Sequence, residues 1–280
     1  MLAGLAKKHP NKRAFITGAG SGLGFAFAEL LAKDGWKLAI TDISAERLAA
    51  VSEKLSAAGG APSTYIFDVS DYAQFKQAVD EFVLKHGGID IGINNAGIGC
   101  GGLIDELPIE TFRKVVDINL LGVLNGCHLF VPIMKKQGSG HILNIASAAA
   151  FVSAPRMSAY NMTKAGVVSL SETLRVELFE HSINVSVLMP SYIRTNIGQD
   201  AIGSTDDVRR AKHLVANADL TAEAVAHETL KKMQAGDLYV VMSDEARFLW
   251  RFKRLFPDRF WRAVASELKQ RISKIDKESP

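Results

Sequence analysis

Short, almost continuously apolar runs recur along the chain, and longer segments with helical spacing separate them. A strand that is apolar on both faces is typical of a parallel sheet that helices cover from both sides. The runs are RAFIT (13–17), KLAIT (37–41), TYIF (64–67), IDIGIN (89–94), HILNIA (141–146), INVSVLM (183–189) and LYVVM (238–242).

The segments between these runs have the lengths and spacing of helices. Their ranges are 22–34, 44–58, 71–86, 109–137, 158–181 and 221–235. Strands that alternate with helices favour a doubly wound sheet, and right-handed crossovers then fix the hand of each unit. We therefore predict an α/β fold: a Rossmann-like, doubly wound parallel sheet of about seven strands, with helices on both faces.

Length and composition exclude several classes of protein. We expect the 280 residues to form one domain at 1–242 and a helical C-terminal extension at 243–280. A net charge of +3 does not indicate a nucleic-acid partner. Cys100 and Cys127 lack metal-ligand spacing, so we expect reduced thiols in a cytoplasmic protein and no metal. We see no apolar run long enough to cross a membrane and no secretory signal at the start.

The tail differs from the rest of the chain. From Ser243 to the end it has ten Lys or Arg and six Asp or Glu, whereas the rest is nearly neutral. Its segment 246–262 interleaves six aromatic with six basic residues and predicts helix on either side of Pro257. Three roles stay open: packing near the pocket or a subunit interface, peripheral contact with an anionic membrane surface, or solvation.

A glycine-rich turn joins the first predicted strand to the first predicted helix. In ITGAGSGLG, residues 16–24, four glycines let the backbone turn sharply and approach a ligand closely. The amides at the start of the following helix would face a pyrophosphate. The spacing is T-G-x-x-x-G-x-G, with Thr17, Gly18, Gly22 and Gly24. Its place between a strand and a helix indicates a dinucleotide site.

This turn and four further motifs resemble the short-chain dehydrogenase/reductase family, in its single-domain soluble branch. The further motifs are NNAG at 94–97, Asn119 within a long helix, Ser147 after a strand, and YNMTK at 160–164. Ser147 precedes Tyr160 by thirteen residues, which is the usual gap in the family. The resemblance covers roughly residues 12 to 242 and implies a nicotinamide-dependent oxidoreductase.

Asp42 ends the second predicted strand and bears on the choice of cofactor. A carboxylate there can accept hydrogen bonds from the adenosine ribose and would repel a 2′-phosphate, which favours NAD over NADP. We find no nearby cation that would offset this repulsion, and Ser21 stands where NADP-preferring relatives often have a basic residue. Asp42 could instead be an N-terminal charge on the next helix, although Ser44 also fits as the cap of that helix.

The resemblance implies further cofactor contacts. Asp68 would bind the adenine amino group, or alternatively cap a helix. Ala96 and Gly97 would pack against the cofactor, while Asn94 and Asn95 steady the sheet. Thr195 would meet the nicotinamide carboxamide; Ser191 replaces the usual family glycine after Pro190, which puts the local loop geometry in question. The expected cofactor-binding residues are Thr17, Gly18, Ser21, Gly22, Leu23, Gly24, Asp42, Ile43, Asp68, Val69, Asn95, Ala96, Gly97, Tyr160, Lys164, Pro190, Ser191, Ile193 and Thr195.

Tyr160 and Lys164 lie four residues apart, on one face of a predicted helix. The pKa of tyrosine is ordinarily about 10, and a nearby cation would lower it toward the operating pH. By resemblance, Tyr160 is the general acid and base, Ser147 positions the substrate oxygen, and Asn119 completes a water-linked proton path to Lys164. A solvated Tyr–Lys pair on a helix surface is the alternative.

The expected substrate is a ketone or secondary alcohol with an apolar body. Residues that should face it are mostly small or apolar. Arg156 or Arg194 could bind a carboxylate, or both could simply face the solvent. We expect the segment 196–216 to form a lid, because it lies between Thr195 and the next predicted helix. The substrate candidates are Ala149, Phe151, Arg156, Tyr192 and Arg194, with Ile98, Gly99, Cys100, Ala148 and Val152 nearby.

Three functions compete on the sequence alone. The first is an NAD-dependent oxidoreductase that acts on a secondary alcohol or ketone. The second is an NADPH-dependent carbonyl reductase, and the third is a dinucleotide-binding scaffold or sensor without turnover. By resemblance we also expect a homodimer or homotetramer, paired through the helices at 109–137 and 158–181.

Overall fold

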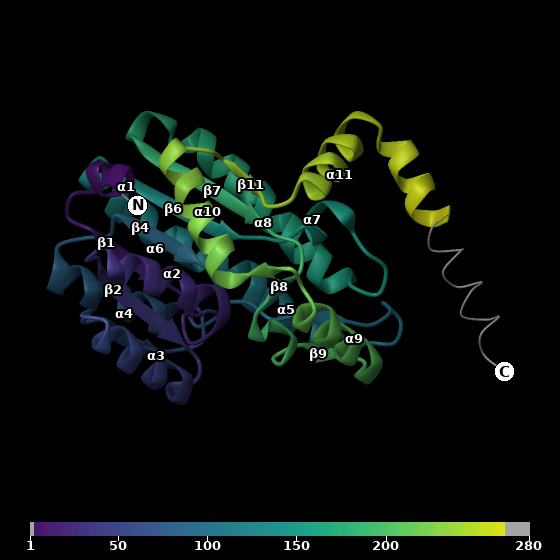
Figure 1. Ribbon diagram of the computed structural model, residues 1–280, viewed down its shortest axis with the longest axis horizontal. Helices are drawn as coiled ribbons and strands as arrows, with labels where there is room; N and C mark the ends of the chain where they lie inside the picture. The colour runs from purple at the N-terminus through teal and green to yellow at the C-terminus, as the bar shows by residue number, and fades with distance from the viewer. Residues whose placement is uncertain (1–2, 267–280) are drawn as a thin grey trace.

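A seven-stranded parallel sheet in the order β3-β2-β1-β4-β6-β7-β11 forms the centre of the computed structural model, which describes residues 3–266 (Figure 1). Each strand overlaps one predicted apolar run, so the predicted doubly wound sheet is confirmed. The strands are β1 (Arg13–Ile16), β2 (Lys37–Asp42), β3 (Ser63–Ile66), β4 (Ile91–Asn94), β6 (Gly140–Ile145), β7 (Ile183–Met189) and β11 (Tyr239–Val241).

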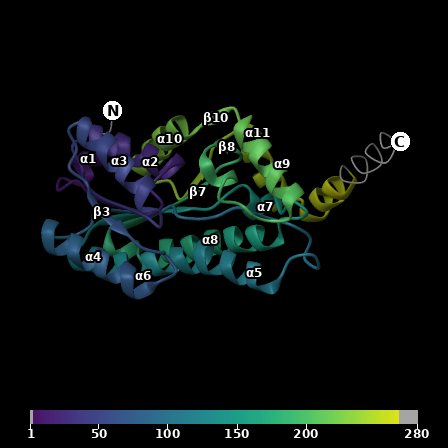
Figure 2. The ribbon, with the colours of Figure 1, turned by 90° about the horizontal axis from the view of Figure 1, so that it is seen from below.

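Helices cover both faces of the sheet (Figure 2). On one face lie α1 (Ala3–Lys8), α2 (Gly22–Lys33), α3 (Ala45–Ala57) and α10 (Ala222–Ala235). On the other lie α4 (Tyr72–His86), α5 (Ile109–Val116), α6 (Gly122–Gln137) and α8 (Ser158–Glu177). Each layer has its own apolar core, as burial on both faces of a parallel sheet requires.

Phe15 of β1 is at the centre of the second core. Its ring lies 5.5–5.8 Å, centroid to centroid, from the rings of Phe75 and Phe82 in α4 and of Phe130 in α6. Aromatic pairs at these separations stabilise a core beyond the area they bury. This cluster holds two helices against the middle of the sheet.

A buried ion pair joins the N-terminal ends of two neighbouring strands. Nη2 of Arg13, at the start of β1, lies 2.7 Å from Oδ1 of Asp90, just before β4. The Arg13 backbone N–H and Nε also donate to Oδ2 of Asp90. Both side chains are buried, so each charge depends on the other for its partners.

Edge strand β3 departs from the predicted burial on both faces. Its residues alternate between half-buried and exposed, and Ile66 is exposed. A strand at the edge of a sheet has neighbours on one side only, so solvent reaches part of it. The prediction of a doubly buried strand is therefore wrong for TYIF.

The predicted helix at 109–137 is not regular. Residues Asp117–Leu121 form a π-helical turn, labelled η1, between α5 and α6. By length and composition, Ile109–Gln137 is also apolar enough to cross a membrane, contrary to the sequence expectation. Gly126, Cys127 and Phe130 of this run are buried where α6 packs on β4 and β6, so the apolar side of the run faces the core.

Residues 199–207, which belong to the segment expected to form a lid, carry regular structure. They include β9 (Ile202–Gly203) and the start of α9 (Thr205–Ala216). β9 pairs with β5 (Cys100–Gly101), and β8 (Ile193–Arg194) pairs with β10 (Leu220–Thr221). A short helix, α7 (Ala149–Val152), follows β6. The sequence predicted neither α1 nor α7.

The tail is helical on both sides of Pro257, as predicted. α11 (Asp244–Leu255) is followed by a helix at 257–266, and this pair extends from one end of the molecule (Figure 1). The Trp250 ring lies 4.9 Å from the Tyr239 ring, and Arg254 forms an ion pair with Glu172 of α8. Contacts between α11 and α7 place the start of the tail near the expected pocket. The predicted extension at 267–280 lies outside the described residues.

Candidate active site

The predicted site residues gather at the carboxyl edge of the sheet. The glycine-rich turn follows β1, Asp42 ends β2, and NNAG begins at the end of β4. Ser147 follows β6, and Pro190 follows β7. In an open parallel sheet, ligands bind outside this edge, at the point where the order of the strands reverses. Here the order reverses at β1, which lies between β2 and β4.

The glycine-rich turn is packed so tightly that side chains are excluded. Gly18 and Gly22 have φ values of +63° and +53°, which favour glycine. A Cβ on Gly18 would lie 2.7 Å from the Cα of Ala96, and a Cβ on Gly24 would lie 2.2 Å from the carbonyl oxygen of Gly18. The glycines therefore serve the close approach of chain segments as well as the turn itself.

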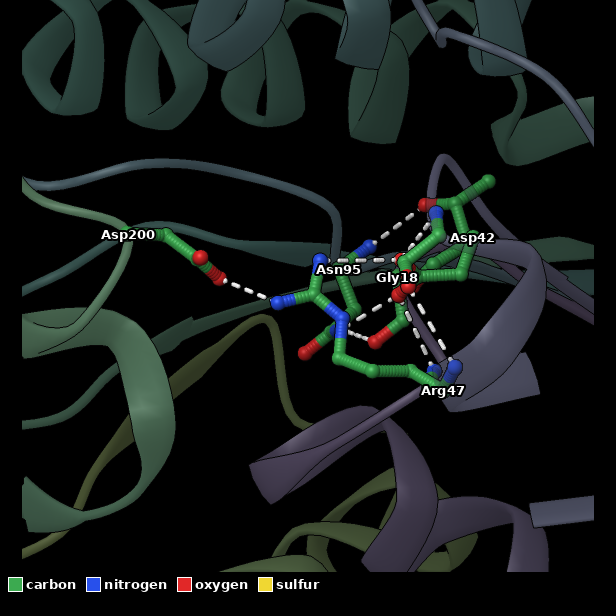
Figure 3. Close-up of polar contacts among 8 residues, drawn as sticks. Gly18, Asp42, Arg47, Asn95 and Asp200 are labelled. Atoms are coloured by element: carbon green, nitrogen blue, oxygen red, sulfur yellow. Dashed lines mark hydrogen bonds and ion pairs between the residues drawn. The ribbon is translucent and has the colours of Figure 1, made fainter. Parts of the chain in front are cut away.

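Hydrogen bonds fasten this turn to the NNAG segment. Nδ2 of Asn95 donates to the carbonyl oxygens of Thr17 (2.9 Å) and Gly18 (3.0 Å), as Figure 3 shows in part. The backbone N–H groups of Asn95 and Ala96 donate to Oγ1 of Thr17. These bonds fix the loops after β1 and β4 relative to each other. The predicted steadying role thus has a direct counterpart in the contacts of Asn95.

Asp42 is buried and held by three donors. Its Oδ2 accepts from the backbone N–H of Gly20 (3.1 Å), and its Oδ1 accepts from the backbone N–H of Ser44 (2.9 Å). Nη2 of Arg47 also donates to Oδ1, at 3.1 Å (Figure 3). The expectation that no cation lies near Asp42 is therefore wrong. Ser44 caps α3 through the backbone N–H of Arg47, as the sequence suggested.

Asp68 is engaged in a local turn after β3. Its Oδ1 accepts hydrogen bonds from the backbone N–H and the hydroxyl of Ser70. The alternative role of Asp68 as a helix cap is wrong, because Asp71 caps α4. Val69 is buried and its carbonyl oxygen accepts from Nδ2 of Asn125 in α6. Ile43, by contrast, is exposed.

Asn119 lies within the π-helical turn η1 and is fully buried. Its Oδ1 accepts from the backbone N–H of Ile98 at 2.8 Å, and its Nδ2 donates to the carbonyl oxygen of Ile98 at 2.9 Å. This reciprocal pair fixes the backbone directly after NNAG. π-Helical turns inside α-helices frequently mark functional sites.

Tyr160 and Lys164 lie on the inward face of α8, and both are buried. Nζ of Lys164 lies 5.6 Å from the centroid of the Tyr160 ring. Ser147, which follows β6, lies near enough to Tyr160 for its hydroxyl to favour the phenolate and so to influence the pKa of Tyr160. The alternative of a solvated pair on the helix surface is therefore wrong.

The acidities of this pair follow from its burial. Burial raises the pKa of Tyr160 to about 12, and the nearby Ser147 hydroxyl opposes that rise only in part. Burial lowers the pKa of Lys164 to about 8, because the ammonium loses its hydration. The predicted lowering of the pKa of Tyr160 is thus wrong for the protein chain by itself.

Lys164 has donors left for a ligand. Its Nζ donates to the carbonyl oxygen of Ile145 at 3.0 Å, the one acceptor it has among the described residues. An ammonium carries three donors. A Cβ on Gly97 would lie 3.5 Å from this Nζ and 3.0 Å from Oδ1 of Asn119. Lys164 and Asn119 therefore face the same glycine, and the spare donors fit the hydroxyls of a ribose lying against it.

The surroundings of Tyr160 on the substrate side are apolar. Tyr160 packs in a cluster with Cys100, Val115 and Ala159, against which further half-buried side chains lie. Those side chains are Ile98, Leu107, Phe112, Ala149, Met157 and Ile202. Phe151 is buried in the neighbouring core, and Tyr192 is about half exposed.

The two candidate arginines differ. Arg156 already has carboxylate partners: Nε and Nη2 donate to Asp207 of α9, and Nη2 also donates to Glu106. Arg194 is exposed, and its Nη2 donates to the carbonyl oxygen of Asp219 at 3.5 Å. Arg156 thus fastens the lid segment, and of the two candidates it is Arg194 that has no carboxylate partner among the described residues.

The loop after β7 has Ser191 where the family usually has glycine, and its backbone accommodates this residue. Ser191 is exposed and is not among the residues with positive φ, so the serine side chain adds no backbone strain there. Thr195 donates to the carbonyl oxygen of Ile193 and caps the following turn only through a long contact. Ile193 is buried, and Pro190 accepts from the Ser147 hydroxyl at 3.5 Å.

Sequence reasoning missed Arg47 and Asp200. Arg47 could have been found, because it lies three residues after the helix cap Ser44, where a side chain can reach back over the end of β2. Asp200 carries no local signal, since its contact with Arg47 joins residues 153 positions apart. Cys100 and Cys127 are both free, as expected, and the described residues contain no cluster of potential metal ligands.

Known proteins resemble this chain in sequence. A family model described as short chain dehydrogenase matches residues 12–206. The probable oxidoreductase EphD of Mycobacterium tuberculosis is 37% identical over 183 residues, which are 65% of this chain and 31% of EphD, so the chain spans about a third of that relative. The 3-oxoacyl-(acyl-carrier-protein) reductase FabG of Thermotoga maritima is 35% identical over 184 residues, or 66% of this chain and 75% of FabG.

A solved structure resembles the whole domain. The short-chain dehydrogenase/reductase of Burkholderia phymatum in complex with NAD has a TM-score of 0.83 and 33% sequence identity, and the match covers 87% of this chain and 92% of that one. The family model covers well over half of the present chain. The chain therefore belongs to the short-chain dehydrogenase/reductase family of NAD(P)-dependent oxidoreductases.

Proposed function

We propose that the protein is an NAD-dependent oxidoreductase that transfers a hydride between a secondary alcohol or ketone and nicotinamide. The observation that carries this proposal is the grouping of buried Tyr160 and Lys164 with half-buried Ser147 at the carboxyl edge of the sheet, where Lys164 lies beside Gly97. Bound nicotinamide would supply the hydride chemistry. The chain would bind, orient and move the proton.

Tyr160 would hold the proton of the reacting oxygen. With a pKa raised to about 12 by burial, its phenol is protonated at neutral pH and ready to donate to a ketone oxygen. In the oxidation direction the phenolate is needed, and positive charge close to the ring favours that form. Lys164 lies 5.6 Å from the ring centroid and, with a pKa of about 8, is mostly charged at pH 7.

Ser147 and Asn119 would orient the reacting groups. The Ser147 hydroxyl lies near the Tyr160 phenol, so a substrate oxygen placed between them would meet two hydroxyl donors. Asn119 holds the backbone of Ile98 and faces Gly97 together with Lys164. We propose that a water-linked proton path, as expected from the family, connects Asn119 to the ammonium of Lys164.

Asp42 supports NAD as the cofactor. Its buried carboxylate lies at the end of β2, where it can receive a ribose hydroxyl and oppose a 2′-phosphate. The Burkholderia phymatum relative was crystallised with NAD. The Arg47 cation beside Asp42 is the observation that favours the second candidate, an NADPH-dependent carbonyl reductase.

The remaining contacts are proposed on their place at the same edge. We assign the pyrophosphate to the turn at 17–24, the adenine to Asp68 and Val69, and the nicotinamide to the segment from Pro190 to Thr195. The apolar cluster around Tyr160 suits a substrate with an apolar body. A cytoplasmic location and peripheral membrane contact through 246–262 stay predictions.

Steady-state kinetics would test the proposal. A panel of secondary alcohols and ketones is offered with NAD(H) and NADP(H), and turnover is followed at the absorbance band of the reduced nicotinamide. We expect turnover with NAD, and a gain with NADP in Asp42→Ala. NAD binding without turnover across the panel would favour the scaffold, and Asp42→Ala with unchanged preference would favour the reductase.

Tyr160→Phe separates chemistry from binding. We expect a loss of kcat of at least about a hundredfold, since general acid–base catalysis contributes roughly 10²–10⁴-fold. The affinity for NAD, measured by calorimetry, should stay near the wild-type value. Tyr72→Phe is the control, because Tyr72 is exposed on α4 and bonds only to His128. Wild-type rates in Tyr160→Phe would remove the catalytic assignment.

A further inference from the structure

The predicted lid, 196–216, is fastened to the rest of the domain at two places near the substrate side. β9 pairs with β5, which follows NNAG, and the side chain of Arg156 holds Asp207 of α9. Both contacts lie around the apolar cluster at Tyr160, to which Ile202 of the lid contributes. A third attachment lies elsewhere, over the adenosine end of the dinucleotide site.

Arg47 makes this third attachment. It lies in the first turn of α3, and its Nη1 donates to Oδ2 of Asp200 in the lid at 2.8 Å. Its Nη2 donates to Oδ1 of Asp42 at 3.1 Å, so one guanidinium joins two carboxylates (Figure 3). Figure 3 shows Arg47 beside the glycine-rich turn, with Asp200 on the far side of the guanidinium.

The two legs of this bridge differ in their surroundings. The Asp42 side chain is 8% exposed, whereas the side chains of Arg47 and Asp200 are 33% and 43% exposed. The Arg47–Asp42 ion pair is therefore shielded from solvent on its carboxylate side, whereas the Arg47–Asp200 ion pair is partly exposed to solvent on both sides. The lid end of the bridge is the part that can open.

The bridge leaves room for a ribose. An ionised carboxylate offers about four acceptor positions, and the chain fills three on Asp42 through Gly20, Ser44 and Arg47. Nε of Arg47 is buried and has no partner among the described residues. One acceptor position on Asp42 thus stays open beside the turn, so a ribose hydroxyl can bond to Asp42 while Arg47 holds its two carboxylates.

We propose that Asp200, Arg47 and Asp42 form a latch that closes the lid across the adenosine end of the dinucleotide site, so that cofactor release requires the latch to open. Arg47 and Asp200 are then positioning residues for the cofactor. This proposal rests on the proposed function in one respect only, the identity of the ligand under the lid; the closure itself is a property of the chain.

Hydrogen exchange of the cofactor-free protein tests the closure. In Asp200→Asn and in Arg47→Gln, amides within 196–216 should exchange about two- to fivefold faster than in the wild type, the range that a partly exposed ion pair provides. The double variant should exchange no faster than either single variant, because both remove the same contact. Asp206→Asn is the control, since Asp206 lies in the same lid and pairs only with exposed Arg209.

Cofactor release tests the coupling. In Asp200→Asn, the rate constant for NADH dissociation, read by stopped-flow fluorescence, should rise about two- to fivefold together with KM for NAD, while kcat does not fall. Asp200→Glu should restore most of the wild-type value, and high salt should narrow the difference between variant and wild type.

The two experiments fail separately. Unchanged lid exchange in Asp200→Asn, or additive effects in the double variant, would overturn the latch. Faster lid exchange with unchanged NADH dissociation would overturn its coupling to the cofactor. If the wild-type protein bound no dinucleotide, the proposed function would fail, yet the exchange data on the cofactor-free chain would still decide whether the latch exists.

Discussion

Lys164 is a cation in a place that disfavours charge. Burial lowers its pKa from 10.5 to about 8. Among the described residues, its ammonium donates to a single carbonyl oxygen, that of Ile145. Below pH 8 the folded protein holds a charged, poorly hydrated ammonium, whereas the unfolded chain holds a hydrated one. The stability of the fold is therefore reduced at neutral pH, which is consistent with the role that we propose for Lys164.

The pH dependence of stability should reveal this group. The unfolded state binds more protons than the folded state between pH 8 and 10.5, so Lys164 makes stability rise with pH across that window. A shift of this size corresponds to roughly 3 kcal/mol. Denaturant unfolding of wild type and Lys164→Met at pH 7 and pH 10 measures it: the wild type should gain on the variant at the higher pH. If the difference in stability between wild type and Lys164→Met were the same at both pH values, the lowered pKa of Lys164 would be refuted.

At the scale of single residues, the sequence predicted which candidate groups lie together better than it predicted their acidities. Tyr160 and Lys164 share a face because four residues make about one helical turn. The direction of the pKa of Tyr160 depended on burial, which the spacing could not reveal. The same holds for Asp42, whose carboxylate is surrounded by two backbone N–H groups and Arg47.

Among the elements, β1 and β4 depend on the buried pair of Arg13 and Asp90. Removing one partner leaves the other charge buried without compensation, so Asp90→Ala should lower the free energy of unfolding by about 3–5 kcal/mol. Chemical denaturation measures this loss. Asp80→Ala is the control, because the Asp80–Lys76 pair is exposed and should change stability by less than about 1 kcal/mol. A similar loss in both variants would contradict the expectation.

The long strands and helices were predictable because the sequence pattern within each element indicates its type. Apolar runs specify doubly buried strands, and helical spacing specifies the covering helices. The short strands that were missed form through distant pairing. β5 and β9 have two residues each, and Cys100 faces Ile202 only after the chain has folded. The lid was therefore predictable as a segment, but its attachments were not.

The whole molecule leaves apolar side chains exposed on the helices expected to pair between subunits. Leu121 and Leu124 in η1 and α6, and Met162 and Val176 in α8, are exposed. These helices lie on the same face of the sheet (Figure 2). Scattered exposed residues are ordinary, but a concentration of them on neighbouring helices is typical of an interface. We therefore keep the homo-oligomer as a proposal.

Solution mass tests that proposal. The wild type should elute as a dimer or tetramer in size-exclusion chromatography with light scattering, and Leu124→Asp should shift it toward the monomer because it places a charge in the interface. Leu84→Asp is the control, because Leu84 is exposed on α4, which is not one of the helices expected to pair between subunits. A monomeric wild type would end the proposal and leave the exposed aromatic residues of the tail to be explained separately.

The wide turn at Asp117–Leu121 has a consequence for the ancestry of the site. A π-helical turn holds one residue more than the α-helical turn it replaces, so it is what a one-codon insertion into a regular helix leaves behind. Deleting Ile118 should restore regular α-helical spacing between α5 and α6 and should take the amide of Asn119 away from Ile98. A single codon thus separates a plain structural helix from one that presents an amide beside Lys164.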